Sequence, residues 1–272
     1  MGRQYYALIS SLPELSLNDS SLKYDLISYR DMLKAEVDEE DYSFLKIAYY
    51  KYDILNFVKL AKEEDHVEWN DAGNFSQEEL SEGMAMPELL PQFFQDFFDL
   101  QQKEWKEQPR KEIINALTAC SLDWSRSIDN TFLKQWISFQ ENLKNLLIWH
   151  NTKKFDKDPK KEILGNSFEA EYLREIDNSS VDLKAWDYAY KEILTHLDNP
   201  NIALREFLID KIRWNYLHDL EQDYYFDKER LLAFAVKLQI VNRNIITKED
   251  KGKAKLQELL SDIKEGYALP EM

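Results

Sequence analysis

The sequence predicts an all-α fold of about ten helices in an elongated or funnel-like array. Only 6 of its 272 residues are Gly and 7 are Pro, and hairpin turn signals such as Asn-Gly are few, which argues against a β-sandwich or barrel. Hydrophobic residues make up 44% of the chain, enough for a packed core. This length is near the upper size for one core, so one all-α unit over residues 1–272 and two or three helical subdomains are both natural.

Polar caps and apolar stripes locate the helices in the first third of the chain. Asp38 and Asp41 precede a stripe at helical spacing that predicts one long helix to about Lys62. The stripe consists of Tyr42, Leu45, Tyr49, Tyr52 and Leu55. Ser76 and Glu79 have the spacing of a capping box, which predicts a short helix in the less regular stretch that follows.

Prolines and polar residues locate the helices in the middle of the chain. Prolines suit the first turn of a helix, so we expect helices at 91–108 and 109–124. Asp129 predicts the start of a third helix at 130–150. The polar segment 151–161 then predicts a boundary.

The C-terminal third is predicted to hold further helices and to end in a helix–turn–helix. Helix starts are expected at Asn166, at Ser179 and at Asn199-Pro200. Asp227 is placed to cap a long amphipathic helix, and Thr247 with Asp250 resembles the capping box of a last helix. The stripe of the long helix consists of Leu231, Phe234, Ala235, Leu238, Val241, Asn242 and Ile245, and Gly266 can close the last helix.

The net charge of −16 bears on the choice of partner. A nucleic acid must be met by clustered Lys and Arg, so this acidic surface argues against nucleic-acid binding. The excess of acidic residues has two interpretations, a simple gain in solubility or docking to a basic partner surface.

Cysteine content and hydropathy indicate the cellular location of the protein. Cys120 is the only cysteine, which excludes an internal disulfide, and its apolar helical surroundings are typical of a buried structural thiol. The N-terminus lacks a long apolar run with a cleavage site, and no segment has the ~18 apolar residues of a membrane span. The sequence therefore predicts a soluble, cytoplasmic protein.

The C-terminal region resembles a known family. Asn242 and Asn244-Ile245-Ile246 stand where the socket subunit of V-type and archaeal-type ATPases has an Asn-Leu-Arg or Asn-Ile-Arg element. This is the C-subunit family, whose eukaryotic members are called the d-subunit. Lys251-Gly252-Lys253 is similar to the short basic Gly loop that follows in that family. Lys237 and Gln239 replace two glutamates that the family usually carries.

The N-terminal segment, residues 4–21, resembles the start of a little-characterised bacterial family encoded in some V-type ATPase operons, which stands in for the socket subunit. Together the resemblances imply a non-catalytic central-rotor subunit that couples the central stalk to the membrane proteolipid ring during ion transport. They imply a peripheral position on the cytoplasmic face of the membrane, with stalk and ring subunits as partners and with no cofactor.

The socket subunit is built from three related helical modules with a recurring Asp-x-x-Asn-Leu type element, which directs attention to internal repeats. Phe44 lies nine residues before Asp53, and Phe132 lies nine residues before Glu141. A third echo precedes Asp210. The corresponding modules are residues 22–100, 109–176 and 181–260, although any all-α protein with acidic helix faces would show some such echoes.

Two polar pairs are candidates for contacts between modules. Asp53 with Asn56, and Asp210 with Arg213, lie three residues apart and so share one helix face. In the functional interpretation they line a shared concavity or tie the modules together. The alternative is a solvated helix face.

The C-terminal helix pair is the candidate interaction edge for the stalk or ring. Arg243 and Asn244 are expected at its turn, and Lys251 and Lys253 in the basic loop. The alternative role for Arg243 is to cap carbonyls at the end of its own helix.

Enzyme chemistry finds little support in the sequence. A di-iron helical bundle needs two Glu-x-x-His pairs, and only Glu63-x-x-His66 exists, within an acidic run that is typical of a solvated surface. Phosphate-binding loops and nucleophile motifs are absent, so we expect no enzyme activity and no bound metal. The alternatives to a rotor subunit are an acidic all-α adaptor and, less favoured, a metal-dependent helical enzyme.

Overall fold

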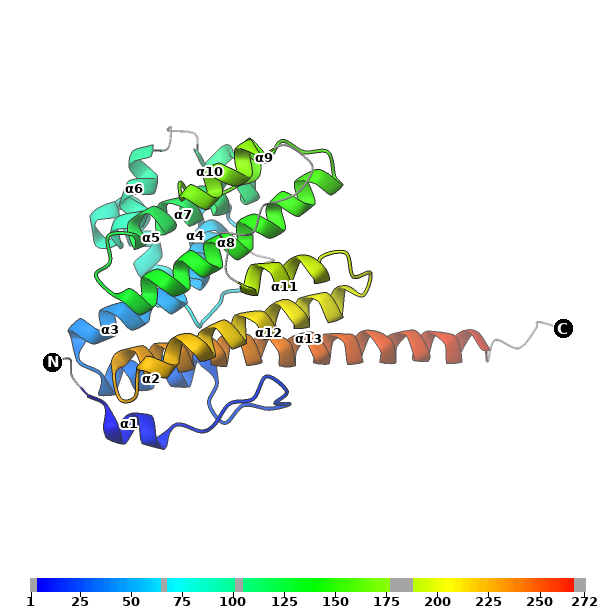
Figure 1. The fold of residues 1–272 in the computed structure, drawn as a ribbon, viewed down its shortest axis with the longest axis horizontal. Helices are drawn as coiled ribbons and strands as arrows, with labels where there is room; N and C mark the ends of the chain where they lie inside the picture. Colours follow the sequence, from blue (N-terminus) through cyan, green and yellow to red (C-terminus); the bar gives the residue numbers. More distant parts are fainter. Residues whose placement is uncertain (1–3, 65–67, 101–104, 177–187, 267–272) are drawn as a thin grey trace.

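The computed structural model describes residues 4–64, 68–100, 105–176 and 188–266, and for 188–189 and 248–266 only the course of the helical backbone. All regular structure in these residues is helical, which confirms the all-α prediction (Figure 1). The first seven α-helices are α1 (Tyr6–Ser11), α2 (Leu26–Glu36), α3 (Glu39–Leu45), α4 (Tyr50–Ala61), α5 (Gln77–Ala85), α6 (Gln92–Leu100) and α7 (Arg110–Ser125). The others are α8 (Thr131–Lys154), α9 (Pro159–Glu162), α10 (Phe168–Glu175), α11 (Tyr188–His196), α12 (Ile202–Leu220) and α13 (Lys228–Gly266).

Two hydrophobic clusters form the core. The larger cluster joins the N-terminal segment to α2, α3, α8 and α10–α13. The smaller cluster joins α4, α5, α6 and α7, with Phe57 and Phe97 fully buried at its centre. Helix α7 thus packs against α4 and α6, so its apolar face belongs to the same cluster as the helices that precede it. Ile47 and Trp124 contact both clusters.

The predicted long helix after Asp38 is interrupted. A 3₁₀ turn at Lys46–Tyr49 separates α3 from α4. Tyr49 is fully buried in the larger cluster, whereas Tyr50 is buried in the smaller one. The interruption therefore marks the place where the chain passes from one cluster to the other, which a single amphipathic stripe could not reveal.

Several helix boundaries follow the predicted caps and others shift. The capping box is confirmed, since the Ser76 hydroxyl accepts from the Glu79 N–H at 3.2 Å and the Glu79 carboxylate accepts from the Ser76 N–H at 2.7 Å. Asn130 rather than Asp129 caps α8, accepting from the Leu133 N–H at 2.9 Å. Helix α8 then extends into the predicted boundary segment and ends there at Lys154.

Other boundaries shift by one to eight residues. The helix predicted at 91–108 ends at Leu100, before 101–104, which lie outside the described residues, and a 3₁₀ turn at 105–107. The helix start expected at Ser179 also lies outside the described residues. The starts expected near Asn166 and Asn199 lie one and two residues later, where Ser167 caps α10 and Asn201 caps α12.

The predicted C-terminal helix–turn–helix is wrong, because α13 is one continuous helix of 39 residues. Thr247 does not cap a new helix, since its hydroxyl donates to the Arg243 carbonyl at 2.8 Å within the same helix. The Lys, Glu, Ala and Leu residues that follow are good helix formers, and no proline interrupts them. Gly252 is therefore accommodated within the helix at a cost of about 1 kcal/mol.

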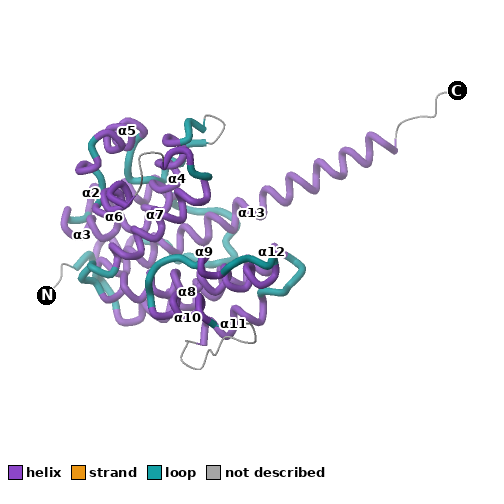
Figure 2. The backbone as a smooth tube through the Cα atoms, turned by 90° about the horizontal axis from the view of Figure 1, so that it is seen from above, coloured by secondary structure: helices purple, strands orange, loops and turns teal. Residues whose placement is uncertain are grey.

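Helix α13 has two distinct halves. Residues 231–236 are all buried, so this part is enclosed by other helices on every side. The second half extends away from the body of the molecule in both views (Figures 1 and 2). At a rise of 1.5 Å per residue the whole helix is about 58 Å long. Within the described residues, no helix is long and apolar enough to cross a membrane.

Candidate functional site

Asp53 and Asn56, on the buried face of α4, hold the loop that precedes α5. The Asn56 side chain donates to the Asn70 carbonyl and accepts from the Asn70 N–H, both at 2.9 Å. Asp53 Oδ1 accepts from the N–H groups of Asn74 at 2.6 Å and Phe75 at 3.2 Å. We call this pair the α4 clamp. Both side chains are at most 2% exposed, so the solvated-face alternative does not apply to them.

Two further residues complete the loop held by the α4 clamp. A Cβ at Gly73 would lie 2.6 Å from Asp53 Oδ1, so only glycine allows the backbone to approach the carboxylate this closely. The Arg30 guanidinium, from α2, donates to the carbonyls of Asp71, at 2.6 Å, and Gly73. The loop backbone is therefore held from two sides.

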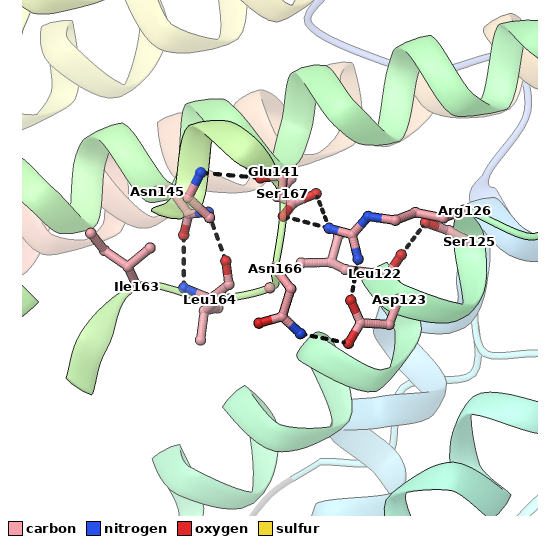
Figure 3. A network of polar contacts seen from close by, with 12 residues as sticks. Leu122, Asp123, Ser125, Arg126, Glu141, Asn145, Ile163, Leu164, Asn166 and Ser167 are labelled. Carbon is pink, nitrogen blue, oxygen red and sulfur yellow. Dashed lines mark hydrogen bonds and ion pairs between the residues drawn. The ribbon is translucent and has the colours of Figure 1, made fainter. Parts of the chain in front are cut away.

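Helix α8 carries a second arrangement of the same kind (Figure 3). The Asn145 side chain donates to the Leu164 carbonyl at 2.8 Å and accepts from the Leu164 N–H at 2.9 Å. Four residues earlier, Glu141 pairs with Arg126 at 3.0 Å and is hydrogen-bonded by the Ser167 side chain. We call Glu141 and Asn145 the α8 clamp.

The loop held by the α8 clamp shares the chemistry of the first. Gly165 has a φ of +73°, and a Cβ there would collide with the Glu141 carboxylate. The Arg174 guanidinium donates to the carbonyls of Ile163 at 3.0 Å and Gly165 at 2.5 Å. A serine that caps the next short helix follows each loop, Ser76 in the first case and Ser167 in the second.

The acids of both clamps, Asp53 and Glu141, have raised pKa values. Burial raises the pKa of Asp53 to about 6, against the opposing effect of its hydrogen bonds from Asn74 and Phe75. Burial also raises the pKa of Glu141, and the Arg126 guanidinium opposes this. In both cases removal from water outweighs the favourable contacts.

Asp210, the acid of the third sequence echo, lies on α12 and has different partners. Its carboxylate pairs with Arg213 at 2.9 Å on the same helix, and with Arg243 of α13 at 2.8 Å. The side chain is 1% exposed, so Asp210 is a buried ion-pair partner and not part of a solvated face. Here an arginine from the following helix takes the role that a loop plays at the two clamps. The superposition of three complete modules stays a prediction.

The predicted partner edge looks different in the structure. Arg243 lies inside α13, where it pairs with Asp210 and, at 3.4 Å, with Glu206. The capping alternative for Arg243 is also wrong, because the helix does not end there. Asn244 is 8% exposed. Lys251 and Lys253 lie on the second half of the helix instead of in a loop, and their side chains lie outside the described part of the chain.

The other residues considered for catalysis or metal binding are Glu63, His66 and Cys120. In the described ranges, no cluster of three His, Cys, Asp or Glu side chains could hold a metal ion. His66 lies outside those ranges, and Glu63 has a positive φ of 52° at the end of a helix. Cys120 is buried in the smaller cluster, and burial raises the pKa of its thiol to about 11.

Sequence reasoning named three of the four clamp residues, with Glu141 as the acid of the second echo, and missed one. It named Asp53 with Asn56 but not Asn145, whose spacing of four from Glu141 differs from the spacing of three on α4. The loop partners were signalled only by turn residues: the run Asn70 to Asn74 and the run Leu164 to Ser167 each contain a glycine before a capping serine. The arginines that hold the loops come from other helices, so local spacing could not reveal them.

The comparisons with known proteins decide the family. The sequence model described as "Protein of unknown function (DUF2764)" matches residues 2–267. The chain belongs to the DUF2764 family. No curated protein and no solved structure matches it. Both clamps of this DUF2764 protein lie within the matched region.

Proposed function

We propose that this DUF2764 protein is a non-catalytic central-rotor subunit of a V-type ATPase, coupling the central stalk to the membrane proteolipid ring during ion transport. It would lie peripherally on the cytoplasmic face of the membrane. The proposal combines the resemblance at both ends of the sequence with one structural observation, the recurrence of an acid-and-asparagine clamp.

The recurrence supports the proposal because the socket subunit has repeated helical modules with an Asp-x-x-Asn-Leu type element. Asp53-x-x-Asn56 has this spacing, and Asn145 makes from α8 the same pair of loop contacts that Asn56 makes from α4. The asparagine contacts, the close approach of a glycine to the acid and the arginine bonds to loop carbonyls recur at both clamps, although the acids differ in their partners.

The contacts also suit a part that carries mechanical load. Each clamp joins a helix to a distant loop through buried hydrogen bonds, and leaving these groups unpaired would cost about 1–3 kcal/mol each. A loop tied in this way resists local opening. Such rigidity is useful in a coupling element and unnecessary in a flexible adaptor.

Purification of the intact assembly tests the proposal. The chain is tagged in its native host, membranes are solubilised in a mild detergent, and the tagged complex is analysed by mass spectrometry and electron microscopy. We expect proteolipid-ring and central-stalk subunits in stoichiometric amounts. Recovery of the chain in a complex that lacks both would contradict the proposal and favour the acidic adaptor.

A charge-reversal variant tests the predicted edge. Replacing Lys251 and Lys253 with Glu should weaken recovery of the ring or stalk if the second half of α13 contacts them. The matched control replaces the exposed Lys34 and Lys154, which gives the same change in net charge. Equal recovery from both variants would remove this edge while leaving the proposed function standing.

A further inference from the structure

A cleft of about 370 Å³ lies between α7, α8 and the segment that contains α9. Three lysines line it, Lys111 from α7, Lys144 from α8 and Lys157 from the segment after α8. Ligand sites in proteins occupy about 300–1,000 Å³, so this cleft suits a small molecule rather than a macromolecular segment.

The cleft carries positive charge on a strongly acidic protein. Glu162 is the acidic residue of its lining, and it pairs with Lys111 at 2.5 Å and with Lys157 at 3.8 Å. The lining therefore contains three lysines and one carboxylate, which leaves an excess of two positive charges. The whole chain has a net charge of −16, so the general surface does not account for this excess.

Lys144 is the central residue of the cleft. It is half-buried, and among the residues that the structure describes no carboxylate pairs with it. Removal from water lowers the pKa of its ammonium group, with no other contribution. A charge held in this way costs stability, and an anion placed beside it would recover that cost.

The lining of the cleft also contains apolar side chains. Ile148 lies one turn beyond Lys144 on α8, and Phe155 follows the end of that helix. The Phe155 ring is 62% exposed, so its surface is open to a ligand. The lining therefore offers both positive charge and an exposed aromatic ring.

We propose that this cleft binds a small organic phosphate, with its phosphate monoester between Lys144 and the other two lysines and its apolar body against Ile148 and Phe155. A phosphate monoester carries a charge of about −1.5 to −2 at neutral pH, which matches the excess of two positive charges. Lysine binds phosphate as a compact point charge with several donors. The inference is independent of the proposed rotor function.

Titration calorimetry with phenyl phosphate tests the site. Phenyl phosphate should bind more tightly than inorganic phosphate, and phenol should not bind, because the cleft uses both charge and ring. Lys144→Met should weaken the binding of phenyl phosphate about tenfold or more. Lys134→Met is the matched control, since Lys134 is an exposed lysine on the same helix, and it should leave the affinity unchanged.

Stability gives a second readout that separates binding from folding. Without ligand, Lys144→Met should melt at the same temperature as the native chain or higher, because an unpaired charge is removed. The rise in melting temperature that phenyl phosphate causes should be lost in this variant alone. Failure of the native chain to bind phenyl phosphate, or equal weakening by the two substitutions, would overturn the proposal.

A separate experiment measures binding of the chain to vesicles that contain phosphatidic acid. If the native chain binds these vesicles and Lys144→Met abolishes that binding, the source of the phosphate is a lipid.

Discussion

At the scale of single residues, the two clamps show how a few buried polar groups define the loops. Asn56 and Asn145 each use both ends of the side-chain amide on one loop residue, so each imitates a backbone pairing. The neighbouring acid then fixes the part of the loop that leads into the next helix. Loss of the asparagine should therefore cost more than loss of a buried asparagine without such contacts.

Replacing Asn56 or Asn145 with Ala should lower the free energy of unfolding by about 2–4 kcal/mol, because buried loop groups lose their partners. Urea denaturation measures the change. Asn142→Ala is the control, since Asn142 is similarly buried on α8 but its Oδ1 has no hydrogen bond within the described residues. If the two substitutions lower the free energy of unfolding no more than the control does, the clamps contribute little to stability.

The raised pKa of Asp53 predicts a dependence of stability on pH. In the folded state its pKa is about 6, and its ordinary value is 3.8, so between these values the folded state binds more protons than the unfolded state. The contribution of Asp53 to the free energy of unfolding should therefore increase as the pH falls from about 6 to about 4, by up to about 3 kcal/mol.

Urea denaturation of the native chain and of Asp53→Asn at pH 4.5 and pH 7 measures this contribution as the difference between the two proteins. The exposed Asp99→Asn should follow the native chain at both pH values. An Asp53→Asn variant with the same pH dependence as the native chain would show that Asp53 does not titrate in this range.

At the scale of elements, polar caps predicted several helix starts to within two residues, and the start predicted at Thr247 was wrong. Ser76 was identified because its capping partner Glu79 is only three residues away. The turn predicted at Thr247 failed because a threonine hydroxyl can bond either to a new helix start or back to the preceding turn, and the sequence looks the same in both cases. The loops of the clamps depend on arginines from other helices, which no local pattern reports.

The continuity of α13 can be tested at Gly252. In a continuous helix, Gly252→Ala should stabilise the second half by about 1 kcal/mol and slow its amide hydrogen exchange. In the basic loop that the sequence suggested, the same change would give no such protection. Hydrogen exchange of residues 248–266 in the two proteins therefore distinguishes the structures.

At the scale of the whole molecule, the N-terminal part of the chain contacts the start of α13 and the segment just before it. The Tyr5 N–H donates to the Phe226 carbonyl at 2.7 Å, and Lys228 pairs with Asp41 at 2.6 Å. The Tyr29 hydroxyl donates to the Leu231 carbonyl at 3.0 Å. The first half of α13 is thus part of the core, whereas the second half leaves the body.

Truncation should separate these two halves. A chain that ends after Thr247 should keep its helical body and melt within a few degrees of the full chain, because the buried residues of α13 are retained. A chain that ends after Leu238 loses buried core residues and should fail to fold. Circular dichroism and thermal melting of the two truncated proteins provide the measurement, and a large drop in melting temperature for the first would contradict the picture of a projecting helix.

The burial of Tyr49 and Tyr50 in different clusters means that neither cluster can unfold as an independent calorimetric unit. Ile47 and Trp124 also pack against both clusters, so the unfolding of one cluster removes packing from the other. A substitution that removes a little packing from the smaller cluster, such as Phe94→Leu, should therefore lower the melting temperature of both clusters. Fluorine-labelled tryptophan gives separate signals for Trp105 in the smaller cluster and Trp136 in the larger. The two signals should disappear together in the native chain, and together again, at a lower temperature, in the variant.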